Sequence, residues 1–282
     1  MAGKLILCAT PIGNLEDISM RAVRALREAD VIAAEDTRNS IRLLNHFDIH
    51  TPMTSYHEYN KYEKGRRLVE RMLKGETVAL ITDAGTPGIS DPGEERAVMA
   101  WDAGVAVTAV PGPAAVITAL TISGLPTRRF VFEAFLPREN KERREVLEEL
   151  RQETRTIVLY EAPHHLRRTL DELRAVLGGD RRVSLCRELT KLHETVIRTT
   201  LDEAAAIYEA EAPRGEYVLV LAGKPREEIR AEAIREWEKL TPAEHMDFYT
   251  GQGMDRKEAM KRVAADRGVS KKEIYRALLE DR

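Results

Sequence analysis

Four loops rich in glycine, proline and carboxylates each follow a short apolar run, and they are the first candidates for chemistry. They read TPIGN at residues 10–14, EDTRNS at 35–40, DAGTPGISDPG at 83–93 and PGPAA at 111–115. Glycine lets a ligand approach the backbone closely, and proline stiffens the loop that carries it. Because the carboxyl ends of parallel strands share one edge of a sheet, we expect the four loops to face a common ligand site.

The EDTR segment places Glu35, Asp36 and Arg38 at the end of one of these runs. Two carboxylates and a guanidinium can orient a bound hydroxyl or accept its proton. Asp36 or Thr37 can equally open the next helix as its N-cap, and the residue types alone favour neither interpretation. The segment SYHEYN at 55–60 can stack on a base or sugar, although a helix start is the more ordinary explanation.

Two further charged segments, YEAPHHL at 160–166 and CRELTKLHE at 186–194, follow later apolar runs. Arg187, Glu188 and Lys191 form either an ion-pair cluster or the lining of a channel for an anionic substrate. The segment GEYVLVLAG at 215–223 is typical of a core strand.

Several other kinds of site are excluded or weakly supported. The glycine-rich nucleotide-binding motifs are absent, and no His/Cys cluster has metal-ligand spacing. Asp83 and Asp91 can hold magnesium, but eight residues apart they are a poor signal. Cys8 and Cys186 are too few for a disulfide framework or a four-thiolate zinc site.

The elements that position these loops alternate between strand and helix. Strands are expected at 5–9, 31–34, 78–82 and 105–110, with helices at 18–29, 40–47, 58–74, 94–103 and 114–123. This alternation predicts a mostly parallel sheet covered on both faces. After the turn-rich segment GLPTRR (124–129) the alternation restarts, with strands at 130–134, 157–160, 183–186 and 218–221, another candidate at 195–201, and helices at 139–152, 164–177 and 201–210. The predicted domains are therefore residues 1–123 and 124–224.

Residues 225–282 form a third predicted region, a helical extension without a strand signal. Helices are expected at 256–266 and 271–279, joined by the turn RGVS in a helix–turn–helix-like arrangement. Residues 256–276 carry eight basic and three acidic side chains. This surplus is either the solvated face of a docking hairpin or a contact for RNA phosphates.

The whole chain of 282 residues has 43% hydrophobic and 32% charged residues and a formal net charge of −3. This balance is typical of a globular protein and excludes a globally basic nucleic-acid binder. The longest apolar stretch, residues 105–120, is broken by prolines and too short to span a membrane, and no export signal is visible. We therefore expect a cytoplasmic protein without a membrane anchor.

The chain carries, in order, the segments TPIGNLEDIS, AEDTRNS, ITDAGTPGISDPG, VPGPAA, YEAPHHL, RELTK and GEYVLVLAG. Together they resemble the ribose 2′-O-methyltransferases of small-subunit ribosomal RNA, in the tetrapyrrole-methylase superfamily. The resemblance implies an α/β fold of two domains, with S-adenosylmethionine in the cleft between them, plus a C-terminal helical extension. It also implies a homodimer in the cytoplasm that methylates a decoding-centre cytidine of 16S rRNA, either free or in the assembled small subunit.

The same resemblance assigns residues to roles. It makes these residues cofactor-binding: Pro11, Asp83, Ala84, Gly85, Thr86, Ile89, Ala114, Ala115 and Tyr160. Candidates for catalysis are Glu35, Asp36, Arg38 and Lys191, and candidates for RNA binding are His57, Asn60, Arg187 and Glu188. The chain departs from the family's pattern at Tyr59, His165 and Thr199. No metal is required.

Three other functions compete with this one. The same fold can methylate a tetrapyrrole carbon or a modified histidine in a protein, acceptors that need no basic tail. A non-catalytic RNA-binding module could keep the cofactor cleft without transferring methyl groups. A phosphotransferase that uses Asp83 and Asp91 would depend on magnesium.

Overall fold

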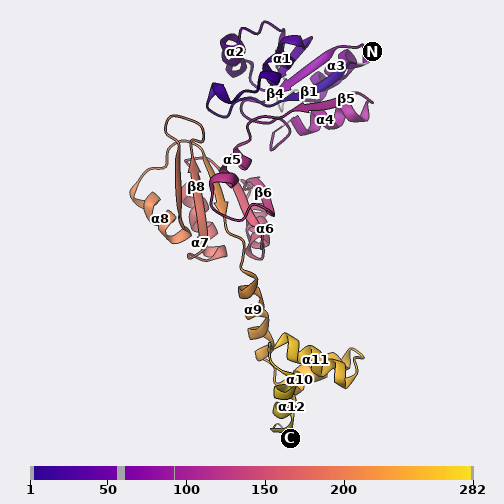
Figure 1. Ribbon diagram of the computed structural model, residues 1–282, viewed down its shortest axis with the longest axis vertical. Coiled ribbons are helices and arrows are strands. Elements are labelled where there is room, and N and C mark those ends of the chain that lie inside the picture. Colours follow the sequence, from indigo (N-terminus) through magenta and orange to yellow (C-terminus); the bar gives the residue numbers. More distant parts are fainter. Residues whose placement is uncertain (1–2, 56–60, 92, 281–282) are drawn as a thin grey trace. The chain divides into compact units, whose positions relative to one another are not determined.

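The computed structural model describes residues 3–55, 61–91 and 93–280, and these residues form two five-stranded sheets and their covering helices (Figure 1). The first sheet contains β1 (Lys4–Cys8), β2 (Val31–Ala34), β3 (Met53–Ser55), β4 (Thr77–Ile81) and β5 (Ala106–Val110). Its order is β3-β2-β4-β1-β5, and every neighbouring pair is parallel. The predicted parallel sheet is therefore confirmed.

Both faces of this sheet are buried, because alternate residues of each strand enter different apolar clusters. Ile6 and Ile32 belong to one cluster and Leu5 and Val31 to the other. The covering helices are α1 (Met20–Glu28), α2 (Thr37–His46), α3 (Lys61–Leu73) and α4 (Gly93–Asp102), with a 3₁₀ turn, η1, at Leu15–Asp17. This two-sided burial explains the continuous apolar runs in the sequence.

The second sheet contains β6 (Phe130–Phe135), β7 (Thr156–Glu161), β8 (Arg182–Arg187), β9 (Thr195–Thr200) and β10 (Tyr217–Leu221), in the order β6-β7-β10-β8-β9. Only β6 and β7 run parallel, and the other three pairs are antiparallel. Its helices are α5 (Ala115–Ile122), α6 (Asn140–Arg151), α7 (Leu166–Leu177) and α8 (Leu201–Ala210). The repeated alternation thus predicted the elements correctly without indicating this change of direction.

Helix α5 packs with the second sheet, although the sequence pattern predicts it in the first domain. Val116, Ala119 and Leu120 share an apolar cluster with Val158 and Val220. The point along the chain at which the first sheet ends and the second begins therefore lies before α5.

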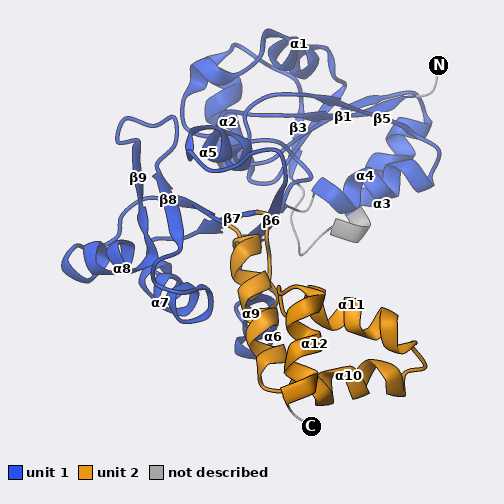
Figure 2. Cartoon of the chain, turned by 60° about the horizontal axis from the view of Figure 1, so that its bottom comes forward, with its two compact units in different colours: residues 1–147, 156–222 blue, residues 148–155, 223–282 orange. Residues whose placement is uncertain are grey.

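The chain divides into two compact units, drawn in blue and orange in Figure 2. The first, residues 1–147 and 156–222, holds both sheets. The second, residues 148–155 and 223–282, holds α9 (Arg226–Glu238), α10 (Pro242–Gly251), α11 (Arg256–Asp266) and α12 (Lys271–Glu280). The division at 123/124 and 224/225 stays a prediction.

In the described part of the chain, none of the helices has the length and apolar character needed to cross a lipid bilayer.

Candidate active site

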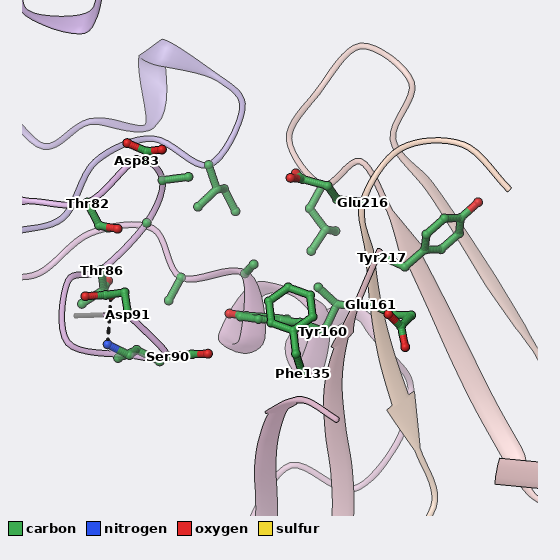
Figure 3. A pocket seen from close by; sticks show the side chains of 18 of the residues that line it. Thr82, Asp83, Thr86, Ser90, Asp91, Phe135, Tyr160, Glu161, Glu216 and Tyr217 are labelled. Atoms are coloured by element: carbon green, nitrogen blue, oxygen red, sulfur yellow. Dashed lines mark hydrogen bonds between the residues drawn. The ribbon is translucent and has the colours of Figure 1, made fainter. Parts of the chain in front are cut away.

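A cavity of about 390 Å³ lies where the loops after β1, β2, β4 and β5 meet the ends of β7, β8 and β10 in the second sheet (Figure 3). Its volume is within the range of small-molecule sites. One side is formed by Ile12, Glu35, residues 82–86, residues 89–91 and residues 114–115. The other side is formed by Phe135, residues 160–162 and residues of the 186–191 and 216–218 segments. Strands β7 and β8 contribute residues at their C-terminal ends, whereas β10 contributes its N-terminal end because it runs antiparallel to both.

Three of the four glycine- and proline-rich loops are hydrogen-bonded to one another. The backbone N–H of Thr10 donates to Gly85 O at 2.8 Å, and the Gly85 N–H donates back at 3.2 Å. The Thr86 hydroxyl donates to Pro113 O at 2.9 Å. Gly85 has φ +85°, and a Cβ there would lie 3.3 Å from Ile12 Cγ2. The backbone angle therefore favours glycine here, and a side chain would crowd Ile12.

In the loop after β2, the side chain of Glu35 has different surroundings from those of Asp36 and Arg38, which follow it in sequence. Glu35 lines the cavity, and its Oε2 accepts a hydrogen bond from the Thr82 hydroxyl at 2.8 Å. Asp36 instead is the N-cap of α2, accepts from the Arg38 backbone N–H and forms an ion pair with the Arg38 side chain at 2.7 Å. The Arg38 side chain is 88% exposed. Asp36 and Arg38 do not line the cavity, so the structure brings only Glu35 of this trio to it.

The side chain of Asp36 is a poor proton acceptor near neutral pH. Its hydrogen bond with the Arg38 side chain, together with the Arg38 backbone N–H, lowers the pKa of Asp36 to about 2. A general base works best when its pKa is near the operating pH. The N-cap interpretation of Asp36 is confirmed.

In the loop after β4, the second aspartate, Asp91, stabilises the loop itself. Asp91 accepts hydrogen bonds from the backbone N–H groups of Gly88, Ile89 and Gly93, one of which is dashed in Figure 3. Asp83 accepts from the Asp36 N–H at 3.1 Å. No group of three or more metal-ligating side chains occurs among the described residues, so the magnesium alternative gains no support.

Lys191 lies between two carboxylates at the other side of the cavity. Its Nζ is 2.9 Å from Glu188 Oε1 and 2.8 Å from Glu216 Oε2. Burial lowers the pKa of Lys191, but these two hydrogen bonds outweigh it and leave the pKa above its ordinary value. The Glu216 backbone N–H and the Lys191 side chain lower the pKa of Glu188. Lys191 is therefore a fixed cation at the cavity wall.

The loop that carries Lys191 is strained and packs closely on the TPIGN loop. Glu188 and Thr190 have φ values of +51° and +65°, which are rare for residues other than glycine. A Cβ at Gly13 would lie 2.8 Å from Thr190 Oγ1. Such strain is found where the surrounding structure holds a functional segment in place.

A β-bulge in β6 places two aromatic rings against Tyr160. The register with β7 shifts between Phe132 and Ala134, and Ala134 has φ +52°. Residues three apart on a regular strand face opposite sides, but the extra residue puts both Phe132 and Phe135 beside Tyr160, with ring centroids 4.9 and 5.6 Å away. Figure 3 shows Phe135 next to Tyr160.

The hydroxyl of Tyr160 has a structural partner. It accepts a hydrogen bond from the Val116 backbone N–H at 3.1 Å, at the start of α5, where Ala114 offers no side-chain cap. Burial raises the pKa of Tyr160. Tyr160 therefore fixes the segment that presents Ala114 and Ala115 to the cavity.

The structure brings eleven of the residues singled out from the sequence to this one cavity: Glu35, Asp83, Ala84, Gly85, Thr86, Ile89, Ala114, Ala115, Tyr160, Glu188 and Lys191. Pro11 and Arg187 lie outside its lining, and the Nε of Arg187 is buried without a hydrogen-bond partner in the described part of the chain. His57 and Asn60 lie outside the described residues.

Sequence reasoning missed several residues that line the cavity, among them Thr82, Phe135, Glu161, Glu216 and Tyr217. Thr82 directly precedes the DAGTP loop, and Glu216 and Tyr217 lie in a segment assigned only to the core. No local pattern marks Phe135, because the bulge that places it depends on pairing with β7.

Comparison with known proteins identifies the family. The family model described as tetrapyrrole (corrin/porphyrin) methylases matches residues 4–205. The chain is 50% identical over 273 residues to ribosomal RNA small subunit methyltransferase I of Halalkalibacterium halodurans, covering 97% of this chain and 93% of that protein. It is 40% identical over 282 residues to the protein of the same name from Escherichia coli O157:H7, covering 99% and 95%.

Solved structures with low identity share the fold. A diphthine synthase has a TM-score of 0.62 and 19% identity, covering 78% of this chain and 90% of that one. A uroporphyrin-III C-methyl transferase from Thermus thermophilus, complexed with S-adenosyl homocysteine, has a TM-score of 0.56 and 20% identity, covering 78% and 97%. This chain therefore belongs to the tetrapyrrole methylase family and, within it, to the ribosomal RNA small subunit methyltransferases I.

Proposed function

We propose that this protein methylates the ribose 2′-oxygen of a decoding-centre cytidine in 16S rRNA. Its relatives are named as methyltransferases of small-subunit ribosomal RNA. The observation that supports an oxygen acceptor is Glu35, a carboxylate that lines the cavity at the carboxyl edge of the parallel sheet. A hydroxyl must lose its proton on methylation, and we assign the role of proton acceptor to Glu35.

The cofactor is S-adenosylmethionine, in keeping with the methyltransferase relatives and the S-adenosyl homocysteine complex of the same fold. The cavity suits this molecule in two ways. Its wall at Ala84, Gly85, Ala114 and Ala115 is made of small residues that let a ligand approach the backbone. Its described lining also contains six acidic residues and one lysine, which suits a cationic sulfonium: Glu35, Asp83, Asp91, Glu161, Glu188, Glu216 and Lys191.

When bound, S-adenosylmethionine supplies a methyl group that is already activated on sulfur. The ribose oxygen would form the new O–C bond as the C–S bond breaks, and the hydroxyl proton would pass to a carboxylate of the cavity. Glu35 Oε2 is held by the Thr82 hydroxyl, while Oε1 has no hydrogen-bond partner among the described residues. Glu35 is therefore oriented by one oxygen and can accept the proton on the other.

Lys191 supplies a positive charge for the phosphates of the RNA strand that accepts the methyl group. It is anchored by Glu188 on one side, while its second partner, Glu216, is 80% exposed. An RNA phosphate can replace an exposed carboxylate at little cost, because exposed ion pairs contribute little. We assign RNA contacts to His57, Asn60 and Arg187 as well, as the resemblance of their segments implies.

The direct test is methyl transfer from labelled S-adenosylmethionine to small-subunit RNA, both free and in assembled subunits. We expect label in the RNA and its recovery as 2′-O-methylcytidine after digestion to nucleosides. Label on a base, or on a protein, would overturn the ribose assignment. Comparing the two substrates at equal concentration then shows which form of the RNA the enzyme uses.

We also propose that the protein acts as a homodimer in the cytoplasm, where ribosomal subunits are made. Helix α4 leaves Val98 and Trp101 exposed, the latter by 74%, which offers an apolar surface to a second copy. Sedimentation of the purified protein should give the dimer mass, and Trp101→Asp should shift it toward monomer. A wild-type monomer at micromolar concentration would contradict this proposal.

A further inference from the structure

In the C-terminal unit, basic residues outnumber acidic ones on two helices, α11 and α12. Of the eight basic residues in 256–276, Arg267 is turned inward: its Nε donates to His245 Nδ1 at 3.1 Å and its Nη2 donates to Trp237 O at 2.9 Å. The other seven are exposed, on α11 and α12. Against the three acidic residues of the same segment they leave a surplus of four charges.

Helix α12 gathers part of this charge on one face. Ile274 is buried in the core of the unit, while Lys271, Lys272, Tyr275 and Arg276 are exposed. Residues one helical turn apart lie side by side, so these four side chains form one surface. We call them the α12 face.

Two acidic residues of α12 offset part of this charge, and Glu273 is close enough to Arg276 for the arginine to lower the pKa of the carboxyl group. Glu273 is turned to the start of the helix, where its Oε2 accepts the Ser270 backbone N–H at 2.6 Å. Glu280 is the last residue of α12. The three exposed cations of the α12 face outnumber these two carboxylates, so the face keeps a net positive charge.

The packing of α10, α11 and α12 holds this face outward. Met246, Tyr249, Ala259, Val263 and Ile274 form a common apolar cluster. The four-residue turn between α11 and α12 contains Gly268 at φ +67°, where a Cβ would lie 3.1 Å from Ile234 Cδ1. In DNA-binding helix–turn–helix proteins, two helices are joined by a short turn that often contains glycine, and the second helix contacts the nucleic acid.

We propose that the α12 face binds the phosphate backbone of double-helical RNA in the small subunit, an inference that rests on the proposed function. Lysine and arginine neutralise phosphates, and the tyrosine can contact the sugar edge. The major groove of RNA is too deep and narrow for side chains to read, so contacts go to phosphates and 2′-hydroxyls. The α12 face therefore holds RNA by shape and charge, without reading sequence.

The test uses the full chain with two triple variants of equal charge change. Lys271→Gln, Lys272→Gln and Arg276→Gln remove the cations of the α12 face. The control, Arg226→Gln, Arg230→Gln and Arg235→Gln, removes three arginines from α9, a helix with five acidic residues. The probe is a small-subunit RNA fragment with a double-helical stem, titrated by fluorescence anisotropy at several salt concentrations.

We expect the α12 variant to bind the fragment at least tenfold more weakly, with a salt slope reduced by about two to three units, because each lost phosphate contact removes roughly one. The control should keep the wild-type slope, and both variants should keep wild-type affinity for S-adenosyl homocysteine. Equal weakening of both variants, or an unchanged slope in the α12 variant, would overturn the inference. So would a loss seen only with the assembled subunit, since that marks a protein contact.

The proposed function is judged separately in the same experiment. Wild-type protein that methylates small-subunit RNA, together with an α12 variant of unchanged RNA affinity, would refute the α12 face alone. Wild-type protein that fails to methylate this RNA would refute the proposed function. Should the triple variant fold poorly, Lys272→Glu, an exposed single change, replaces it with the same expected direction.

Discussion

Glu35 and Asp36 are adjacent in sequence, but their carboxylates have different surroundings. Glu35 lines the cavity beside Thr82, whereas Asp36 caps α2 and pairs with Arg38. We expect Glu35→Gln to lower the single-turnover rate of methyl transfer by ~10²–10⁴-fold, the usual contribution of a proton acceptor. Affinity for S-adenosyl homocysteine, measured by calorimetry, should stay within a few-fold of wild type.

Asp36→Asn is the matched control for that experiment. It removes an equal charge one residue away, so its transfer rate should stay near wild type. The melting temperature should fall only slightly, because asparagine keeps the capping oxygen and loses only the ion pair with Arg38. A rate loss in Asp36→Asn as large as in Glu35→Gln would contradict the assignment of the proton to Glu35.

Two glycines of the loop after β4 allow a second comparison. Gly85 and Gly88 have φ values of +85° and +83°, so valine is equally strained at both. Only Gly85 lines the cavity, where its Cβ would meet Ile12. We expect Gly85→Val to abolish calorimetric binding of S-adenosylmethionine and Gly88→Val to retain it. Equal affinities in the two folded variants would remove Gly85 from the cofactor site.

At the scale of elements, the apolar runs predicted most strands because burial on both faces leaves a continuous signal. Strand β3, with the sequence MTS, has no such run and was missed. Helix α2 begins at Thr37 and not at Ser40, because Asp36 caps it earlier than the first apolar residue indicates. The elements were thus predictable wherever local burial decides them.

The antiparallel course of the second sheet and the bulge in β6 were not predictable in the same way. Both depend on which strands become neighbours, and that choice is made by contacts distant in sequence. The candidate site divides similarly: loops such as DAGTP carry a local signal, whereas Phe135 enters the cavity only through pairing of β6 with β7.

Helix α7 is tied to its sheet by a buried polar chain. The Thr169 hydroxyl donates to Glu161 and accepts from Arg143 Nη2 at 2.7 Å, and Arg143 Nε lies 2.6 Å from Glu172. Thr169→Val leaves Glu161 and Arg143 without this link, so we expect a loss of about 1–3 kcal/mol in the free energy of unfolding.

Urea denaturation checks this loss, with Thr121→Val as the control. Thr121 is exposed, and its hydroxyl only bonds Ile117 O within α5, so its replacement should change stability by less than about 0.5 kcal/mol. Equal effects of the two substitutions would show that the buried hydrogen bonds of Thr169 contribute nothing to the free energy of unfolding beyond the change of side chain.

At the scale of the whole molecule, the cavity and the C-terminal core belong to different compact units. The cavity is lined entirely by residues 12–218, whereas the apolar cluster of the tail spans residues 246–278. We expect deletion of residues 241–282 to weaken RNA binding and flatten its salt dependence while calorimetric affinity for S-adenosylmethionine persists.

A tail that only supports the fold predicts a different outcome for that deletion. The melting temperature and the oligomer mass would then change while the salt slope of RNA binding stayed intact. Measuring the slope together with the melting curve separates the two roles.

The acidic lining of the cavity bears on how the enzyme completes its cycle. Six carboxylates and one lysine line the cavity, and the donor loses its sulfonium charge when its methyl group leaves. Attraction to the wall therefore weakens at the moment of transfer, which favours release of the spent donor and limits product inhibition. Salt screens the attraction between the sulfonium of S-adenosylmethionine and the carboxylates, an attraction that S-adenosyl homocysteine lacks. The preference for S-adenosylmethionine over S-adenosyl homocysteine should therefore shrink as ionic strength rises. Calorimetric affinities of the two molecules at low and high salt measure this preference, and a ratio independent of salt would show that the carboxylates do not set it.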